Sequence, residues 1–115
     1  MIFVIDDDNV MAKCLERISG VEAMIFSNAI EAMECISCGK IPDLIFLDVL
    51  LDGPNGFTFL NEVVSYSDTR EIPIVIVSSM DFSGKDLSSY GIVGVLNKDN
   101  MLPEEIRGYV EKYAK

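Results

Sequence analysis

The chain is 115 residues long, half of them hydrophobic, and it carries a formal net charge of −10 at pH 7. This length allows one domain with a single core, and the composition excludes a disordered chain and a membrane span of about 20 apolar residues. The acidic balance argues against direct binding to nucleic acid, which needs Lys and Arg at phosphates. We therefore expect one domain over residues 1–115, cytoplasmic because no signal peptide is apparent, with no output domain and no membrane contact.

The chain contains five apolar runs of strand length, and each run ends in polar or turn residues. Continuous runs of Val, Ile, Leu and Phe are typical of strands that are buried on both faces of a sheet. The predicted strands cover residues 2–5, 22–26, 44–47, 74–77 and 93–96.

Helical spacing of apolar residues fills the intervals between these runs. Asp8 is interpreted as the cap of a first helix that ends at Gly20, with apolar positions at Val10, Met11, Cys14, Leu15 and Ile18. A second helix stops at Gly39, with apolar positions at Ile30, Met33 and Ile36. Further helices are predicted from the spacing of Phe57, Leu60, Val63 and Val64, more weakly over 81–90, and from Pro103 onward with Ile106, Val110 and Tyr113 inward.

Three cysteines, an odd number without a secretory context, argue against a disulfide framework. Cys35 and Cys38 form a C-x-x-C pattern, which also occurs in redox and metal sites. The chain has no second pair and no histidine, so a zinc site would lack ligands. The pair falls late in a predicted helix, where a thiolate is not favoured. We interpret these cysteines as structural thiols, with a redox role as the alternative.

Strands that alternate with helices form a parallel sheet, because parallel neighbours need right-handed crossover connections. The predicted fold is α/β, a flavodoxin-like doubly wound domain with a five-stranded sheet in the order 2-1-3-4-5. In this order the first and third strands are neighbours, so Asp6 and Asp7 after one strand meet Asp48 after the other. Ser78 and Lys98 follow the fourth and fifth strands at the same edge.

Three carboxylates in one place repel one another, and a divalent cation between them relieves that repulsion. Mg²⁺ is suited to this place because it takes oxygen ligands and keeps room for phosphate oxygens. One carboxylate can then attack a phosphoryl group, while a serine hydroxyl and a lysine ammonium bind the other phosphoryl oxygens. The pattern therefore predicts a magnesium-dependent phosphoryl-transfer site at this edge.

Over essentially its full length the chain resembles a response-regulator receiver domain, through Asp6-Asp7, Asp48, Ser78 and Lys98 at the four strand ends. The resemblance implies that Asp48 is the phosphoacceptor and that Asp6 and Asp7 hold Mg²⁺. It also implies that the backbone carbonyl of Leu50 is a further metal ligand.

By the same resemblance, Ser78 is the switch hydroxyl that turns toward the phosphoryl group, and Lys98 is ion-paired to that group. The chain departs from the family at Val95, where the family has a switch aromatic, and at Asp52, where it has a proline. The departure at Val95 bears on how phosphorylation is reported to a partner.

Leu50 and Met80, each two residues beyond a site residue, are expected to flank the phosphoryl group. Apolar side chains there cannot orient an attacking water. We therefore expect slow loss of the phosphoryl group by hydrolysis.

The resemblance implies a phosphorelay component, not an enzyme, that takes its phosphoryl group from a histidine kinase or phosphotransfer protein. A downstream protein partner would read the signal, and the chain would be a monomer or weak dimer. One alternative is a receiver-like scaffold that is never phosphorylated. Another is a haloacid dehalogenase-like phosphatase, for which Asp6 and Asp8 supply an Asp-x-Asp pattern but Leu50 replaces the acid/base after Asp48.

Overall fold

The computed structural model describes residues 1–6, 8–27, 29–48, 72–78, 92–97 and 102–114. The described elements are, in chain order, β1 (Ile2–Ile5), α1 (Asn9–Ser19), β2 (Ala23–Phe26), α2 (Ala29–Ser37), β3 (Leu44–Asp48), β4 (Ile74–Ser78), β5 (Ile92–Asn97) and α4 (Pro103–Tyr113). The helices predicted around residues 57–64 and 81–90 lie outside the described residues.

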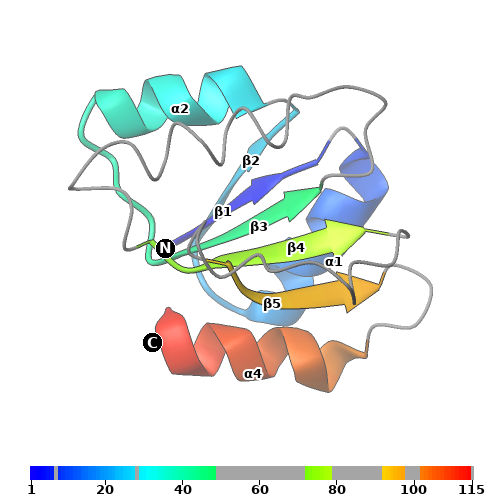
Figure 1. The fold of residues 1–115 in the computed structure, drawn as a ribbon. Helices are drawn as coiled ribbons and strands as arrows, with labels where there is room; N and C mark the ends of the chain where they lie inside the picture. Colours follow the sequence, from blue (N-terminus) through cyan, green and yellow to red (C-terminus); the bar gives the residue numbers. More distant parts are fainter. Residues whose placement is uncertain (7, 28, 49–71, 79–91, 98–101, 115) are drawn as a thin grey trace.

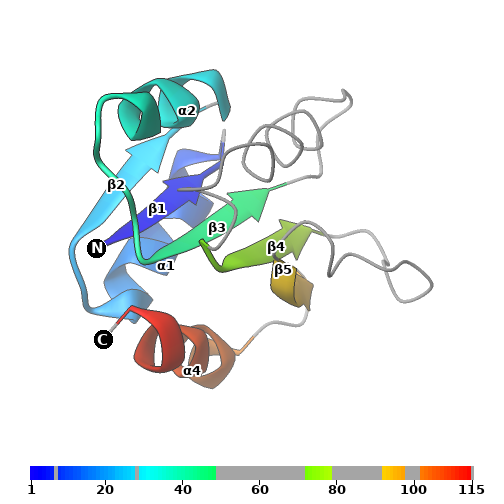
Figure 2. The ribbon, with the colours of Figure 1, turned by 60° about the vertical axis from the view of Figure 1, so that its left-hand side comes forward.

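The five strands form one parallel sheet in the order β2-β1-β3-β4-β5, which confirms the predicted topology. In Figure 1 and Figure 2 α2 covers one face of this sheet, whereas α1 and α4 lie on the other. All strands therefore deliver their carboxyl ends to the same edge, at the right of Figure 1. Within the described residues no helix is long and apolar enough to cross a membrane.

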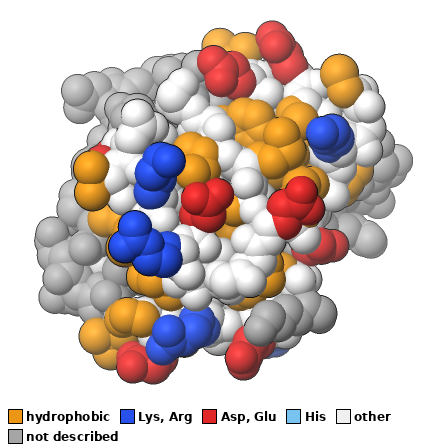
Figure 3. Space-filling view, turned by 180° about the vertical axis from the view of Figure 1, so that it is seen from behind, with side chains coloured by type: hydrophobic (Ala, Val, Ile, Leu, Met, Phe, Trp, Pro, Cys, Tyr) orange, Lys and Arg blue, Asp and Glu red, His pale blue; other side chains and the backbone are white. Residues whose placement is uncertain are grey.

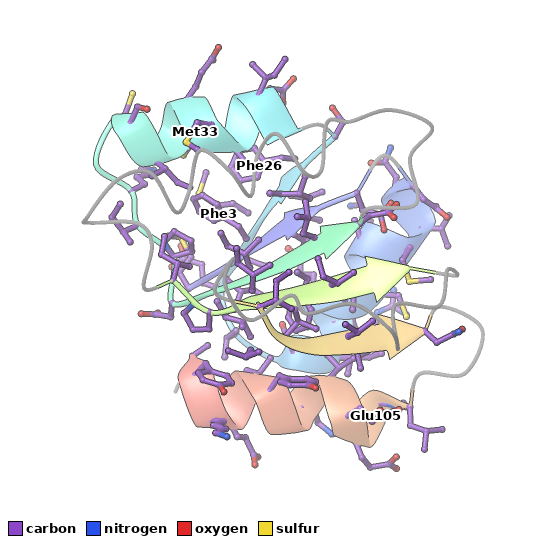
Figure 4. All side chains as sticks on the ribbon, in the orientation of Figure 1. Phe3, Phe26, Met33 and Glu105 are labelled. Atoms are coloured by element: carbon purple, nitrogen blue, oxygen red, sulfur yellow. The ribbon has the colours of Figure 1, made fainter. Side chains whose placement is uncertain are left out.

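The core has two parts because the central strands bury side chains on both faces. On the α2 side, residues of β1, β3 and β4 pack with Ala32 and Ile36. Phe3 and Phe26 lie in this part with ring centroids 4.8 Å apart, and Met33 lies above them in Figure 4. On the other side, alternate residues of the same strands pack with α1 and α4. The runs that form β1, β3 and β4 thus became strands buried on both faces, as predicted. The edge strands β2 and β5 are only partly buried, and β5 exposes Val93 and Val95.

Local sequence signals account for the helix ends. Gly20 follows α1 at φ 67°, a left-handed conformation that a residue without Cβ adopts at little cost. Pro103 opens α4, where its missing N–H would be unsatisfied in any case. The Glu105 side chain, labelled in Figure 4, accepts a hydrogen bond of 3.0 Å from the backbone N–H of Leu102. These signals determine where α4 begins.

Three apolar positions assigned to helix stripes were wrong. Val10 is 81% exposed and Ile30 is 70% exposed, and Cys14 is also exposed. Helix α1 instead buries Ala12, Leu15 and Ser19. At about 100° per residue, Val10 lies about 140° around the helix from Leu15, outside a stripe that faces the sheet. Five strand boundaries also differ by one residue from those predicted. Strand β2 begins at residue 23 and β5 at residue 92, and β3, β4 and β5 end at residues 48, 78 and 97.

The three cysteines are free thiols in different surroundings. Cys35 is half-buried and packs against the α2-side core, whereas Cys14 and Cys38 are exposed. Only Cys35 therefore has a packing role, and the structural interpretation applies to that residue alone.

A substitution of Phe46, in the middle of β3, tests how much side-chain packing around this strand contributes to the stability of the fold. Its side chain is 1% exposed. Phe46→Ala is expected to lower the free energy of unfolding by about 3–5 kcal/mol, because it removes a buried ring and leaves a cavity. The matched control Val10→Ala, at an exposed position, should change it by less than about 0.5 kcal/mol. Urea unfolding followed by circular dichroism measures both, and equal effects would contradict the described core.

Candidate functional site

The site begins with two acidic residues at the ends of adjacent strands. The last paired residues of β1 and β3 are Ile5 and Leu47, so Asp6 and Asp48 each stand one residue beyond that pair. Neighbouring strands lie about 4.8 Å apart, which brings the two residues side by side. Both are only 2% exposed. The predicted meeting of Asp6 and Asp48 is therefore confirmed.

Hydrogen bonds around β1 hold Asp6 in this place. Its backbone N–H donates to the carbonyl oxygen of Phe26 at 3.0 Å, which extends the β1–β2 pairing by one residue. One of its carboxylate oxygens, Oδ1, accepts a hydrogen bond of 2.8 Å from the backbone N–H of Asp8. This two-residue contact is the Asx turn typical of Asp at the end of a strand. The chain direction between β1 and α1 is thereby fixed with the carboxylate at the edge of the sheet.

Asp8 has a different structural role from Asp6. Its Oδ1 accepts hydrogen bonds from the backbone N–H groups of Val10 at 3.0 Å and Met11 at 3.3 Å. These are N–H groups at the start of α1 that have no partner within the helix. Asp8 is thus the helix cap, as the sequence predicted, and its side chain is exposed.

The burial of Asp6 and Asp48 has an electrostatic cost. Two carboxylates removed from water and placed side by side repel each other. A cation between them offsets this cost, and Mg²⁺ prefers carboxylate oxygens. The donor set of these two residues therefore fits a hard divalent cation. Among the described residues there is no cluster of three acidic or cysteine side chains, and Asp7 is outside them.

The other predicted site residues are placed only in part. Ser78 is the last residue of β4, whose previous residue, Val77, pairs with Asp48. Asp7, Leu50 and Lys98 lie outside the described residues. Their assigned roles therefore stay predictions.

Asn97 also lies at this edge, and the sequence reasoning gave it no role. It ends β5, is half-buried and pairs directly with Ser78. The only sequence signal was a polar residue at the end of an apolar strand. Which residue of β4 pairs with Asn97 depends on the register between β4 and β5.

Charge on the face of the molecule that lies behind the view of Figure 1 is mixed. Figure 3 shows acidic and basic side chains interspersed with apolar ones among the described residues of that face. Nucleic-acid binding surfaces gather Lys and Arg instead. This face therefore offers no sign of a nucleic-acid interface in the part of the chain that is described.

A family model described as "Response regulator receiver domain" matches residues 2–111. The chain belongs to this family. The response regulator PleD of Caulobacter vibrioides is 31% identical over 85 residues, which is 72% of this chain and 19% of PleD. The curated relatives that the chain matches are longer, since it spans 10% to 33% of their lengths.

Solved structures show that the fold is shared. The phosphorylated cyanobacterial phytochrome response regulator RcpA superposes with a TM-score of 0.81 at 21% identity, covering 99% of this chain and 93% of RcpA. The Mn²⁺-bound form of the response regulator Rcp1 gives a TM-score of 0.75 at 19% identity, covering 96% of this chain and 91% of Rcp1. Both structures share the fold of this chain, in agreement with the family match.

The cap role of Asp8 can be separated from the metal site by mutation. Asp8→Ala is expected to lower the free energy of unfolding by about 1 kcal/mol, because two N–H groups of α1 lose their acceptor. Asp8→Asn should retain most of that stability, since its amide oxygen can still accept. Neither change should weaken Mg²⁺ binding, measured by calorimetric titration. Weaker binding in Asp8→Asn, with stability unchanged, would place Asp8 in the metal site instead.

Proposed function

We propose that this chain accepts a phosphoryl group on Asp48 with the help of Mg²⁺ and passes the signal to a protein partner by a change of conformation. The observation that carries the proposal is the pair of buried carboxylates, Asp6 and Asp48, at adjacent strand ends of a receiver domain. Carboxylates with a purely structural role are seldom buried side by side, because each raises the free-energy cost of burying the other.

In the proposed reaction, an oxygen of Asp48 attacks the phosphorus of a phosphohistidine on the donor protein. The new O–P bond makes an aspartyl phosphate, the P–N bond to the donor imidazole breaks, and that nitrogen takes a proton from water. The Ser78 hydroxyl and the Lys98 ammonium donate hydrogen bonds to the phosphoryl oxygens. Asp48 is consumed in each transfer and is regenerated when the acyl phosphate loses its phosphoryl group, so the domain acts as a phosphoryl acceptor and not as a turnover enzyme.

Asp6, Asp7, Asp48 and the backbone carbonyl of Leu50 are the groups proposed to hold Mg²⁺. When bound, Mg²⁺ would supply positive charge that offsets the negative charge of the phosphoryl oxygens. The buried Asp6 and Asp48 support this assignment, as does the Mn²⁺-bound form of Rcp1. The Oδ1 atom of Asp6 accepts a hydrogen bond from the Asp8 N–H, which restrains the orientation of its carboxylate.

The partners follow from this chemistry. The donor is a histidine kinase or a phosphotransfer protein, and the receiver of the signal is another protein or another domain of a longer chain. Such a relay operates in the cytoplasm, where we propose that this domain is found. Phosphorylation adds charge at the carboxyl edge and thereby biases two conformations of the domain that a partner distinguishes.

The proposed function is tested by chemical phosphorylation. The protein is incubated with acetyl phosphate or phosphoramidate and Mg²⁺, and its intact mass is measured. We expect one added phosphoryl group, lost when Mg²⁺ is chelated and lost in Asp48→Asn. The control Asp43→Asn, at an exposed acidic position before β3, should be phosphorylated like the unmodified protein. No addition would support a scaffold role, and rapid turnover of small phosphate esters would support a phosphatase.

The lifetime of the phosphorylated form tests the roles proposed for Leu50 and Met80, which lie outside the described residues. Two apolar side chains beside the phosphoryl group would leave water unoriented. Leu50→Asn combined with Met80→Glu is therefore expected to speed decay by about tenfold or more, because a carboxylate can act on the attacking water. The matched control Leu50→Ile with Met80→Leu keeps both positions apolar and should decay slowly. Equal decay of all three proteins would contradict this expectation.

A further inference from the structure

The backbone at the end of α2 is held in a defined turn that contains Cys35 and Cys38. The N–H of Gly39 donates to the carbonyl oxygen of Ile36 at 2.9 Å. The N–H of Lys40 donates to the carbonyl oxygen of Cys35 at 3.3 Å. With Gly39 at φ 101°, these two bonds form a Schellman motif, a common helix end in which a glycine adopts positive φ. The helix end therefore sets where the two cysteines lie relative to each other.

The two cysteines lie one helical turn apart. The N–H of Cys38 donates to the carbonyl oxygens of Glu34 at 3.1 Å and Cys35 at 3.2 Å. The bond to Cys35 spans three residues, as in a 3₁₀ turn, where side chains three residues apart lie one above the other. Such a turn separates the two Cα atoms by about 5–6 Å. Disulfides need a separation of about 4.4–6.8 Å, so a bond between these thiols requires little change of the backbone.

The two cysteines differ in exposure, which gives them different parts in an oxidation. Cys38 is exposed, whereas Cys35 is half-buried and packs against the α2-side core. A disulfide compound in solution therefore reaches Cys38 first. Once Cys38 carries a mixed disulfide, the neighbouring thiol one turn away can attack its sulfur. The arrangement is that of an exposed thiol beside a resolving cysteine.

Cys14 provides a contrast within the same molecule. It is exposed on α1, which lies on the face of the sheet opposite to α2 (Figure 1). With the sheet between them, Cys14 cannot form a bond with Cys35 or Cys38 of the same chain. An oxidant that acts on Cys14 must therefore stop at a mixed disulfide.

The cysteine pair is separate from the acidic edge. Helix α2 runs back from the end of β2, so its last turn lies at the edge where the strands begin, at the left of Figure 1. Asp6 and Asp48 lie at the other edge, where the strands end. In the cytoplasm, where we propose that this domain acts, disulfides are mostly transient and redox-sensing. A bond between Cys35 and Cys38 would accordingly be a reversible one.

We propose that Cys35 and Cys38 are a modification site, at which glutathione disulfide oxidises the pair to a reversible disulfide. The Cys38 thiol loses its proton to water and attacks one sulfur of glutathione disulfide, whose S–S bond breaks to release one reduced glutathione. The Cys35 thiol then loses its proton and attacks the Cys38 sulfur, which releases the second glutathione. Two electrons and two protons thereby pass from the pair to the two glutathiones. The proposal does not depend on phosphorylation of Asp48.

The test uses the full chain with Cys14→Ser, which removes the third thiol. The folded protein is incubated with glutathione disulfide, quenched with acid, and its intact mass is measured without reductant. We expect a product lighter by two hydrogen atoms and free of glutathione, about tenfold or more in excess over the mixed disulfide, because the second thiol is already in place. Excess reduced glutathione should restore the starting mass. Glutathione retained on the protein, a doubled mass or no reaction would overturn the proposal.

Matched variants show whether the neighbouring thiol is responsible. Cys35→Ser in the same background leaves the exposed Cys38 alone, so the reaction should stop at one bound glutathione. The chain with Cys35→Ser and Cys38→Ser retains only Cys14 and should also stop at one. Loss of two hydrogen atoms in either variant would contradict the assignment of the bond.

A comparison in concentrated urea tests the role of the fold. The turn at the end of α2 holds the two thiols one above the other, so the disulfide should form in the folded protein, with the circular dichroism spectrum retained. A disulfide that forms in urea but not in the folded protein would overturn the proposal and leave the phosphoacceptor role of Asp48 unaffected.

Discussion

The structure depends on the parallel pairing of β1 with β3. This pairing is in register up to Ile5 and Leu47, and it leaves Asp6 and Asp48 side by side with 2% of each residue exposed. Burial of two like charges is unfavourable. The buried apolar residues that precede them in β1 and β3 must therefore contribute the free energy that offsets this cost. Val4 and Phe46, two residues before each carboxylate, are among those buried residues. The same arrangement gives a pair of carboxylates that fits a hard divalent cation.

The helices cover the core and also hold the carboxyl ends of the strands in place. Helix α2 covers one face of the sheet, while α1 and α4 cover the other, so the strand ends cannot shift independently of the core (Figure 2). The turn from β1 into α1 combines two hydrogen-bonded acids: Asp6 accepts from the N–H of Asp8, and Asp8 caps α1. A rigid sheet with loops at one edge is the usual way in which α/β domains combine a fixed site with variable partners.

Much of this could be predicted from the sequence because its signals are local. Continuous apolar runs predicted the strands, and the acidic residues that end them predicted the site. The exposure of Val10 and Ile30 could not be predicted in the same way, since helical spacing gives a stripe but not its width. The pairing of Ser78 with Asn97 could not be predicted either, because it depends on a register shift between two separate strands, β4 and β5. Long-range register is fixed by packing and not by the residues next to the site.

The central claim is that Asp48, held beside Asp6, is the residue that accepts the phosphoryl group. The most direct measurement is to phosphorylate the protein with acetyl phosphate and Mg²⁺, reduce it with borohydride, and map its peptides by mass spectrometry. Borohydride converts an aspartyl phosphate to homoserine and leaves free carboxylates unchanged. The account predicts homoserine at position 48 and at no other aspartate. Homoserine at position 6 or 8, or a phosphoryl group that survives reduction on a serine, would contradict it.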